Sequence, residues 1–138
     1  MIKDEYSPYK FIHHTDKADS LSNGIPVSPI QVQLIPTNRC NHNCVGCAYR
    51  LDGYSSSQNF NTKDQLSIEK VNEILSDCSD MGVKAAQLTG GGESTVHPNI
   101  KEIMKVILDY GMDLALVTNG SKMDPEMCEI LSDSSWVR

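Results

Sequence analysis

The sequence alternates between short apolar runs and longer segments whose apolar residues recur at helical spacing, and this alternation restricts the fold more than any other feature. The apolar runs predict three strands, at residues 31–37, 83–89 and 114–117. The segments that follow them predict three helices, at residues 67–81, at 98–111 and from Asp124 onward. Strands and helices that alternate in this way are typical of parallel βαβ units in an α/β fold. Because the strands are apolar without a clean alternation, we expect a parallel sheet that is covered on both faces.

Capping residues support the ends of these helices. Ser67 can cap the start of the first helix, and Gly82 can close its end. Pro98 suits the first turn of the second helix. Asp124 and Pro125 together predict the start of the third, as an N-cap followed by proline at the first helical position.

The predicted elements divide the chain into a lead-in segment, residues 1–30, and a partial core domain, residues 31–138. The lead-in is polar and mixed, with one short helix expected near Asp16–Leu21. Residues 135–138 are typical of the entrance to a fourth strand. Three βα units cannot close a barrel, since a complete eight-unit barrel takes about 250 residues. We therefore expect the chain to be a fragment of a longer protein.

Composition excludes several classes of protein. The formal net charge is −6, and Lys and Arg are scattered singly, so the basic patch of a nucleic-acid-binding protein is missing. No run approaches the roughly 18 apolar residues of a membrane span. The first residues lack the apolar core and cleavage site of a secretory signal. A cytoplasmic location is the expectation.

The five cysteines predict metal binding rather than disulfides. Cys40, Cys44 and Cys47 fall within eight residues, in a C-x3-C-x2-C spacing, and the odd total argues against a disulfide framework. The other two, Cys78 and Cys128, lie in predicted helices, where we expect them to be small buried hydrophobic residues.

The cysteine loop directly follows the first predicted strand. This places it at the carboxyl end of a parallel sheet, where the active sites and ligand-binding sites of α/β proteins lie. Three thiolates on one loop can ligate three irons of a cubane cluster and leave the fourth iron open. Zinc is an alternative, but it needs a fourth ligand, which would have to be His42 or a distant histidine such as His97. Cysteines without any ligand are the third possibility.

A glycine-rich turn, Gly90-Gly91-Gly92-Glu93, follows the second predicted strand. It lacks the lysine of a Walker loop, and Thr95 stands where a dinucleotide fingerprint needs its third glycine. Both phosphate-binding interpretations therefore fail. What remains is a turn whose bare backbone lets a ligand approach closely.

The cysteine spacing after the first strand, with Gly-Gly-Glu after the second, resembles the radical S-adenosylmethionine (SAM) superfamily. The resemblance implies a partial parallel barrel of that type, with three βα units out of about six. It also implies a [4Fe–4S] cluster on Cys40, Cys44 and Cys47, with SAM chelating the open iron. An electron, supplied by an external donor such as flavodoxin or ferredoxin, would cleave SAM to methionine and a 5′-deoxyadenosyl radical that abstracts hydrogen from a substrate.

By position, the same resemblance implies SAM contacts for Gly90, Gly91, Gly92, Glu93, Tyr49, Thr118 and Asn119. Backbone groups of the glycine motif would bind the SAM amino group. Thr118 and Asn119 follow the third strand and would face the same pocket. Two positions depart from the family pattern: Gly46 stands where an aromatic often precedes the third cysteine, which makes Tyr49 the nearest aromatic, and Ser94 stands where proline is frequent.

The substrate cannot be read from this chain, because in the family the fourth and later strands surround it. The segment through Pro36–Asn41 resembles members that modify peptides or proteins and carry a C-terminal cysteine-rich domain, and a small molecule remains an alternative. Two alternatives to an active enzyme also stay open. One is a zinc-stabilised binding module without catalysis, and the other is an inactive truncated remnant.

Overall fold

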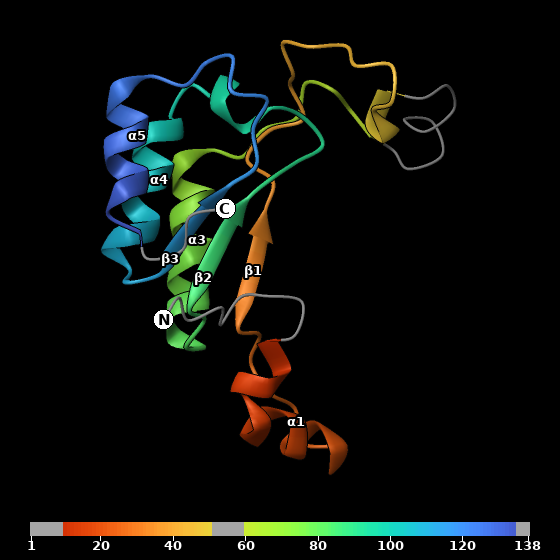
Figure 1. Ribbon diagram of the computed structural model, residues 1–138, viewed down its shortest axis with the longest axis vertical. Helices are drawn as coiled ribbons and strands as arrows, with labels where there is room; N and C mark the ends of the chain where they lie inside the picture. The colour runs from red at the N-terminus through yellow and green to blue at the C-terminus, as the bar shows by residue number, and fades with distance from the viewer. Residues whose placement is uncertain (1–9, 51–59, 135–138) are drawn as a thin grey trace.

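A computed structural model describes residues 10–50 and 60–134, in which three parallel strands form one sheet (Figure 1). The strands are β1 (Gln31–Leu34), β2 (Ala85–Leu88) and β3 (Asp113–Leu116), in the order β1-β2-β3. The predicted α/β fold with a parallel sheet is thus confirmed. The predicted entrance to a fourth strand, residues 135–138, lies outside the described residues.

Three helices pack against one face of this sheet, α3 (Ile68–Asp80), α4 (Ile100–Asp109) and α5 (Pro125–Ser132) (Figure 1). The caps predicted for two of them are present. Ser67 Oγ accepts a hydrogen bond from Lys70 N at 3.3 Å, and Asp124 Oδ1 accepts one from Met127 N at 2.9 Å. The prediction that Pro98 lies in the first turn of the helix was wrong, because α4 begins at Ile100 and Pro98 lies in the turn before it.

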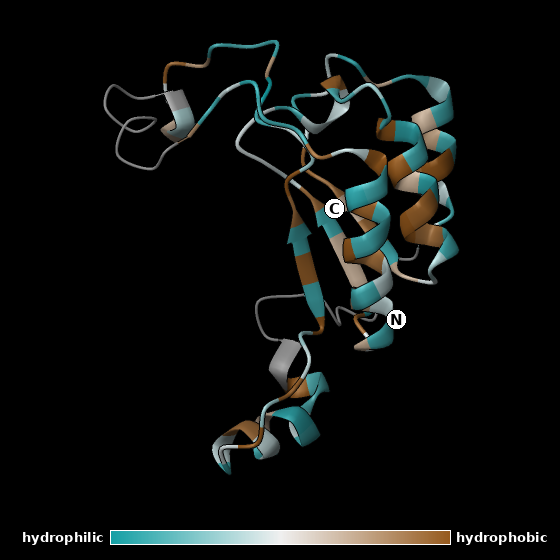
Figure 2. Ribbon diagram, turned by 180° about the vertical axis from the view of Figure 1, so that it is seen from behind, coloured by the Kyte–Doolittle hydropathy of each residue, from teal (hydrophilic) through white to brown (hydrophobic). Residues whose placement is uncertain are grey.

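The hydrophobic core fills the layer between the sheet and these helices (Figure 2). Alternate strand residues point into it: Val32, Leu34, Ala86, Leu88, Leu114 and Leu116. The helices contribute a matching set of fully buried side chains: Val71, Leu75, Ile103, Met104 and Ile107. This layer fixes the strands in register, so that Leu34, Leu88 and Leu116 lie side by side at the carboxyl edge of the sheet.

The second face of the sheet is partly buried: Ala85 and Ala115, which lie on it, are 0% and 2% exposed. Gln33 is exposed there, and Gln31 Nε2 donates to Gln87 Oε1 at 3.4 Å. Among the described residues, all three core-packing helices lie on the opposite face (Figure 1). The reason is the two-residue period of the strands, which sends the glutamines away from the helices.

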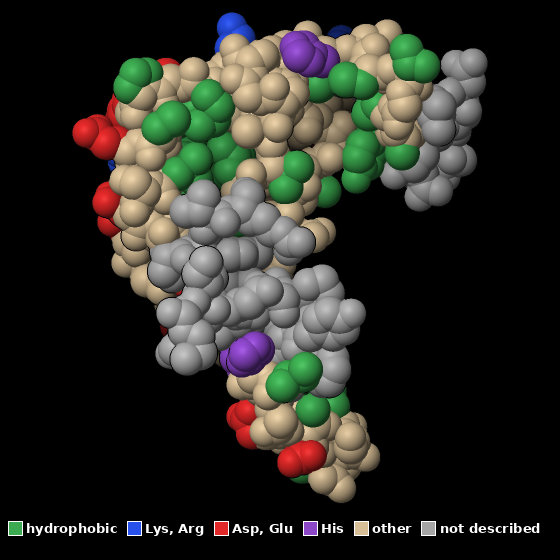
Figure 3. Space-filling model, viewed as in Figure 1, with side chains coloured by type: hydrophobic (Ala, Val, Ile, Leu, Met, Phe, Trp, Pro, Cys, Tyr) green, Lys and Arg blue, Asp and Glu red, His purple; other side chains and the backbone are tan. Residues whose placement is uncertain are grey.

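The lead-in segment forms a short 3-10 turn, η1 (Lys10–His13), and the helix α1 (Thr15–Ser22), which confirms the short helix expected near Asp16–Leu21. Helix α1 buries none of its residues and projects away from the sheet (Figure 1). Acidic side chains lie on this segment and on the outer edge of the molecule near α5 (Figure 3). No helix of the described residues is long and apolar enough to cross a bilayer.

The two cysteines outside the cysteine loop behave differently. Cys78 is buried in the core with 5% of its surface exposed, as predicted. The prediction for Cys128 was wrong, because this residue is exposed on α5. Helix α5 turns Met127 and Ile130 toward the core, and the next residue after Met127 lies about 100° further around the helix.

Candidate functional site

Three loops leave the carboxyl edge of the sheet next to one another. We call residues 38–47 the cysteine loop, residues 90–93 the glycine turn and residues 117–121 the β3 loop. Because the strands are parallel and in register, the loops that follow them emerge at the same edge (Figure 1). The site residues predicted from the sequence therefore come from three segments that the fold brings together.

A hollow of about 310 Å³ lies between the three loops. Its lining contains two of the three clustered cysteines and residues of all three loops: Cys40, His42, Cys44, Thr89, Gly90, Gly92, Glu93, Val117, Thr118 and Asn119. Most of the residues predicted to meet a cofactor thus face one shared space. Cys47, Gly91 and Tyr49 lie outside this lining.

The three cysteines are accessible but not gathered around one point. Cys40 and Cys47 are half-buried and Cys44 is exposed, while the neighbouring Val45 is 99% exposed at the tip of the loop. Among the described residues, no three His, Cys, Asp or Glu side chains lie close enough together to hold a metal ion. The donor set nevertheless suits an iron–sulfur cluster, because three thiols stand on one loop beside a hollow.

In the zinc alternative, His42 or a distant histidine such as His97 would have to supply the fourth ligand. His97 is buried, its Nε2 lies 2.8 Å from Leu66 O, and its Nδ1 accepts from Asn99 N at 3.1 Å. Both ring nitrogens are therefore engaged within the protein, and His97 does not supply a fourth zinc ligand. His42 is exposed and lines the hollow.

The glycine turn packs directly against the backbone of the cysteine loop. A Cβ atom on Gly92 would overlap Arg39 O, and the next residue, Glu93, donates its N–H to the same oxygen at 2.8 Å. A Cβ atom on Gly91 would overlap the ring of Phe60 and Asn38 Oδ1. These two glycines are therefore required by the packing of the protein itself, in addition to any ligand that approaches the turn.

Glu93 joins the glycine turn to the β3 loop through a buried carboxylate, with 4% of the residue exposed. Its Oε1 accepts from Thr95 N at 2.9 Å, from Thr95 Oγ1 at 2.6 Å and from Thr118 Oγ1 at 2.6 Å. Its Oε2 accepts from Asn119 N at 2.7 Å. Burial raises the pKa of this carboxyl, but the hydrogen bonds from Asn119, Thr118 and Thr95 outweigh burial and leave the pKa below its ordinary value.

The cysteine loop is also hydrogen-bonded to the β3 loop, a contact that no local sequence pattern predicted. Asn119 Nδ2 donates to Asn41 Oδ1 at 3.1 Å, and Asn41 Nδ2 donates to Ser121 Oγ at 2.7 Å. Within the β3 loop, Asn119 Oδ1 accepts from Ser121 N at 3.0 Å and from Ser121 Oγ at 2.7 Å. Asn41 and Ser121 are thus part of the site, although local sequence patterns did not single them out.

Tyr49 lies on the short turn η2 (Ala48–Arg50), where its ring stacks on Phe60 with centroids 5.5 Å apart and planes at 28°. Phe60 in turn covers Gly91. The aromatic pair therefore borders the glycine turn beside the hollow. Sequence reasoning missed Phe60, because an isolated phenylalanine after a polar stretch carries no pattern.

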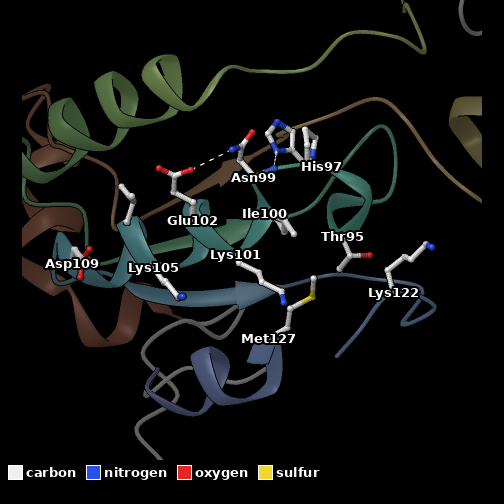
Figure 4. Close-up of a pocket in the computed structure, with 12 residues that line it drawn as sticks. Thr95, His97, Asn99, Ile100, Lys101, Glu102, Lys105, Asp109, Lys122 and Met127 are labelled. Carbon is white, nitrogen blue, oxygen red and sulfur yellow. Dashed lines mark hydrogen bonds between the residues drawn. The ribbon is translucent and has the colours of Figure 1, made fainter. Parts of the chain in front are cut away.

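A larger hollow of about 820 Å³ lies beside α4 and α5 and shares no lining residue with the first (Figure 4). Two lysines of its lining form ion pairs: Lys101 Nζ lies 2.8 Å from Asp124 Oδ2 and 2.6 Å from Glu126 Oε2, and Lys105 Nζ lies 2.9 Å from Glu126 Oε1. These ion pairs join the two helices. No cysteine in the described part of the chain lines this larger hollow, whereas Cys40 and Cys44 line the smaller one.

The fold and the site define an α/β protein with a thiol-bearing loop at the carboxyl edge of a partial parallel barrel. A family model described as the Radical SAM superfamily matches residues 34–138. The chain belongs to the radical SAM superfamily.

Relatives and solved structures agree with this family. A probable GTP 3′,8-cyclase of Thermococcus kodakarensis is 35% identical over 100 residues, covering 72% of this chain and 30% of the relative. The antilisterial bacteriocin subtilosin biosynthesis protein AlbA of Bacillus subtilis is 34% identical over 110 residues, covering 80% of this chain and 22% of the relative. Streptococcus suis SuiB bound to precursor peptide SuiA has a TM-score of 0.66 at 20% identity, covering 95% of this chain and 28% of that one. SuiB bound to S-adenosylmethionine has a TM-score of 0.63.

The coverage percentages also show what fraction of a family member's length this chain spans. It spans 30% of the length of the Thermococcus relative and 22% of that of AlbA. The described residues accordingly contain three βα units of the barrel.

Proposed function

We propose that this chain is the cluster-binding part of a radical SAM enzyme, with Cys40, Cys44 and Cys47 holding a [4Fe–4S] cluster beside a SAM site. When bound, the cluster supplies the electron that cleaves SAM reductively and so starts hydrogen abstraction from a substrate. The observation that carries the proposal is the shared hollow, in which Cys40 and Cys44 face the glycine turn and the β3 loop.

Each loop contributes a distinct property to the proposed site. The cysteine loop offers three accessible thiols, and its exposed tip leaves room for them to converge. The glycine turn offers backbone without side chains at Gly90 and Gly92, both of which line the hollow. The carbonyl groups of such a turn are suitable acceptors for an ammonium group like that of SAM.

Part of the lining of the proposed site is apolar. Val117 is 52% exposed at the end of β3 and lines the hollow together with Thr89. An apolar surface beside polar backbone suits a ligand that has both a charged amino-acid end and a less polar remainder. The substrate and the electron donor, for which flavodoxin or ferredoxin is our proposal, would bind elements beyond this chain or its outer surface.

The ligand assignment can be tested by reconstitution without oxygen. The chain is incubated with ferrous iron and sulfide, and iron and acid-labile sulfide are measured per chain together with the visible absorbance. We expect about four irons for the unchanged chain and a clear loss of iron for Cys40→Ala, Cys44→Ala and Cys47→Ala. Cys128→Ala is the matched control, because this cysteine is exposed like Cys44 but lies on α5, and it should load normally.

Two results would contradict the proposal. One is a Cys44→Ala chain that assembles a complete cluster, which would remove the ligand assignment. The other is protein purified without oxygen that contains one zinc and no sulfide, which would indicate the zinc-stabilised module. A loaded chain that yields no 5′-deoxyadenosine with SAM and a strong reductant would favour an inactive remnant or a fragment that cannot complete the reaction alone.

A further inference from the structure

Asn119 has nearly all of its hydrogen-bonding capacity engaged by the protein. Its Oδ1 accepts twice from Ser121, and its Nδ2 donates to Asn41 Oδ1 at 3.1 Å. Its backbone N–H donates to Glu93 Oε2 at 2.7 Å. A primary amide has two donor hydrogens and two acceptor lone pairs, so one N–H is all that its side chain has left for a ligand.

The partner of Asn119 is the residue that directly follows Cys40. Asn41 uses both halves of its amide for this contact, since Oδ1 accepts from Asn119 and Nδ2 donates to Ser121 Oγ at 2.7 Å. The pairs lie 78 and 80 positions apart in the sequence. We call the contact of Asn41 with Asn119 and Ser121 the amide clamp.

A second contact holds the same end of the cysteine loop from the other side. Arg39, the residue before Cys40, accepts from Glu93 N at 2.8 Å, and Arg39 N donates to Thr37 Oγ1 at 3.1 Å. Cys40 is therefore flanked by anchored residues. Cys44, in contrast, is exposed, and the hydrogen bond from Cys47 N to Cys44 O at 3.1 Å stays within the loop.

We infer that Asn119 is a positioning residue, which holds Cys40 at the edge of the hollow through Asn41 and does not act as a cofactor ligand. Its importance for the cluster rests on the proposed function, whereas the clamp itself is a contact of the chain alone. One cysteine is then fixed in advance, and the exposed remainder of the loop closes around the cluster.

The first experiment measures the clamp in the chain without iron. Alkylation of each cysteine by iodoacetamide is followed over time under reducing conditions by mass spectrometry of peptides. Asn119→Ala removes the Asn119–Asn41 hydrogen bond of the clamp, and Asn41→Ala removes both that bond and the bond to Ser121. Either change should speed alkylation of Cys40, by roughly two- to tenfold for each net hydrogen bond lost. The rate at Cys44 should change little, because this thiol is already exposed.

Internal controls separate the clamp from general unfolding. Cys78 is buried and should stay unreacted in every variant that is folded, and exposed Cys128 provides the reference rate. Asn43→Ala is the matched control, because Asn43 is an exposed asparagine of the same loop for which the described part of the chain provides no hydrogen-bond partner. The Asn41→Ala, Asn119→Ala double variant should match Asn41→Ala, because that single change already removes both hydrogen bonds of the clamp.

The second experiment uses the cluster-loaded chain. Loss of iron to a chelator should be roughly two- to tenfold faster in Asn119→Ala and in Asn41→Ala, by the same energetic argument. SAM binding, measured per loaded cluster, should be equal in the two variants. A direct SAM contact predicts a different pattern, in which Asn119→Ala weakens SAM binding and Asn41→Ala leaves it unchanged.

The outcomes distinguish this inference from the proposed function. If the unchanged chain takes up a cluster but neither variant alters Cys40 alkylation or iron loss, the inference is overturned and the function stands. If weaker SAM binding is confined to Asn119→Ala, Asn119 is a ligand and the inference is again overturned. If both variants expose Cys40 but no chain binds iron and sulfide, the clamp is upheld and the proposed function falls.

Discussion

Glu93→Gln tests the connection between the glycine turn and the β3 loop, because it keeps the size of the side chain and removes its charge. Oε1 of Glu93 accepts from Thr95 N, and Oε2 accepts from Asn119 N. In glutamine one of these oxygens becomes an NH₂ group. Whichever way the amide is turned, a donor then faces a backbone N–H donor in a buried position.

The expected cost follows from that geometry. At least one hydrogen bond to a charged group is lost and one buried N–H is left without an acceptor, which is typically worth about 1.5–3 kcal/mol. We therefore expect Glu93→Gln to lower the free energy of unfolding at pH 7 by about 2 kcal/mol. The assay is urea denaturation under reducing conditions, followed by circular dichroism. Glu129→Gln, at an exposed position of α5, is the control and should stay within about 0.5 kcal/mol of the unchanged chain.

The pH dependence gives an independent check. The pKa of Glu93 lies below its ordinary value of 4.5 in the folded chain, so its contribution is present above that pH and is lost as the pH falls through the lowered folded value. Glutamine does not titrate. The difference between the two proteins should therefore be constant near neutral pH and shrink below about pH 4.5. Other carboxyls with a lowered pKa cancel, because both proteins contain them.

The reasoning would be refuted by a Glu93→Gln chain as stable as the unchanged one at pH 7. A difference in stability that is the same at pH 7 and at pH 3.5 would refute it as well, since it would place the cost outside the charge of the carboxylate.

Three further substitutions test other parts of the fold by urea denaturation. Gly92→Ala should cost about 1–3 kcal/mol because its Cβ would overlap Arg39 O, whereas Gly46→Ala, with nothing within 4 Å of the added atom, should be nearly neutral; equal effects would contradict the proposed packing. Asp124→Ala should cost about 1 kcal/mol by removing the cap of α5, and Asp124→Asn should restore most of it. Ile103→Ala should cost about 2–5 kcal/mol because Ile103 is fully buried in the core, and a loss below 1 kcal/mol would contradict that placement.

Local sequence patterns were sufficient for the elements of the fold. The helical spacing of apolar residues and the cap at Ser67 located α3, and Asp124 with Pro125 located the start of α5. Such signals act over a few residues, so they can be read directly from the sequence. The order of strands and helices then placed the cysteine loop and the glycine turn at the same edge of the sheet.

Features that depend on distant parts of the chain were predicted less well. The environment of Cys128 was wrong, because the short helix α5 buries one narrow face and this residue lies beside it. The exposure of Gln33 on the second face of the sheet was also not anticipated, although Ala85 and Ala115 on the same face are buried. Apolar strands predict burial, but they do not state which neighbouring elements provide it.

The contacts between the loops could not be predicted at all. Glu93 and Asn119 are 26 positions apart, and Asn41 and Ser121 are 80 positions apart. Each pair is joined by side-chain hydrogen bonds whose partners are chosen by the packing of the sheet. The family motif predicted a role of Glu93 toward a cofactor through backbone groups, and the structure adds a second role, because its carboxylate holds the β3 loop.

Each of the three loops around the hollow is hydrogen-bonded to the other two. The cysteine loop meets the glycine turn through Arg39 O, the glycine turn meets the β3 loop through Glu93, and the β3 loop meets the cysteine loop through Asn41. Because each loop contacts both of the others, none of the three can shift without straining hydrogen bonds to its neighbours. We therefore expect a ligand that displaces the β3 loop to shift the start of the cysteine loop as well.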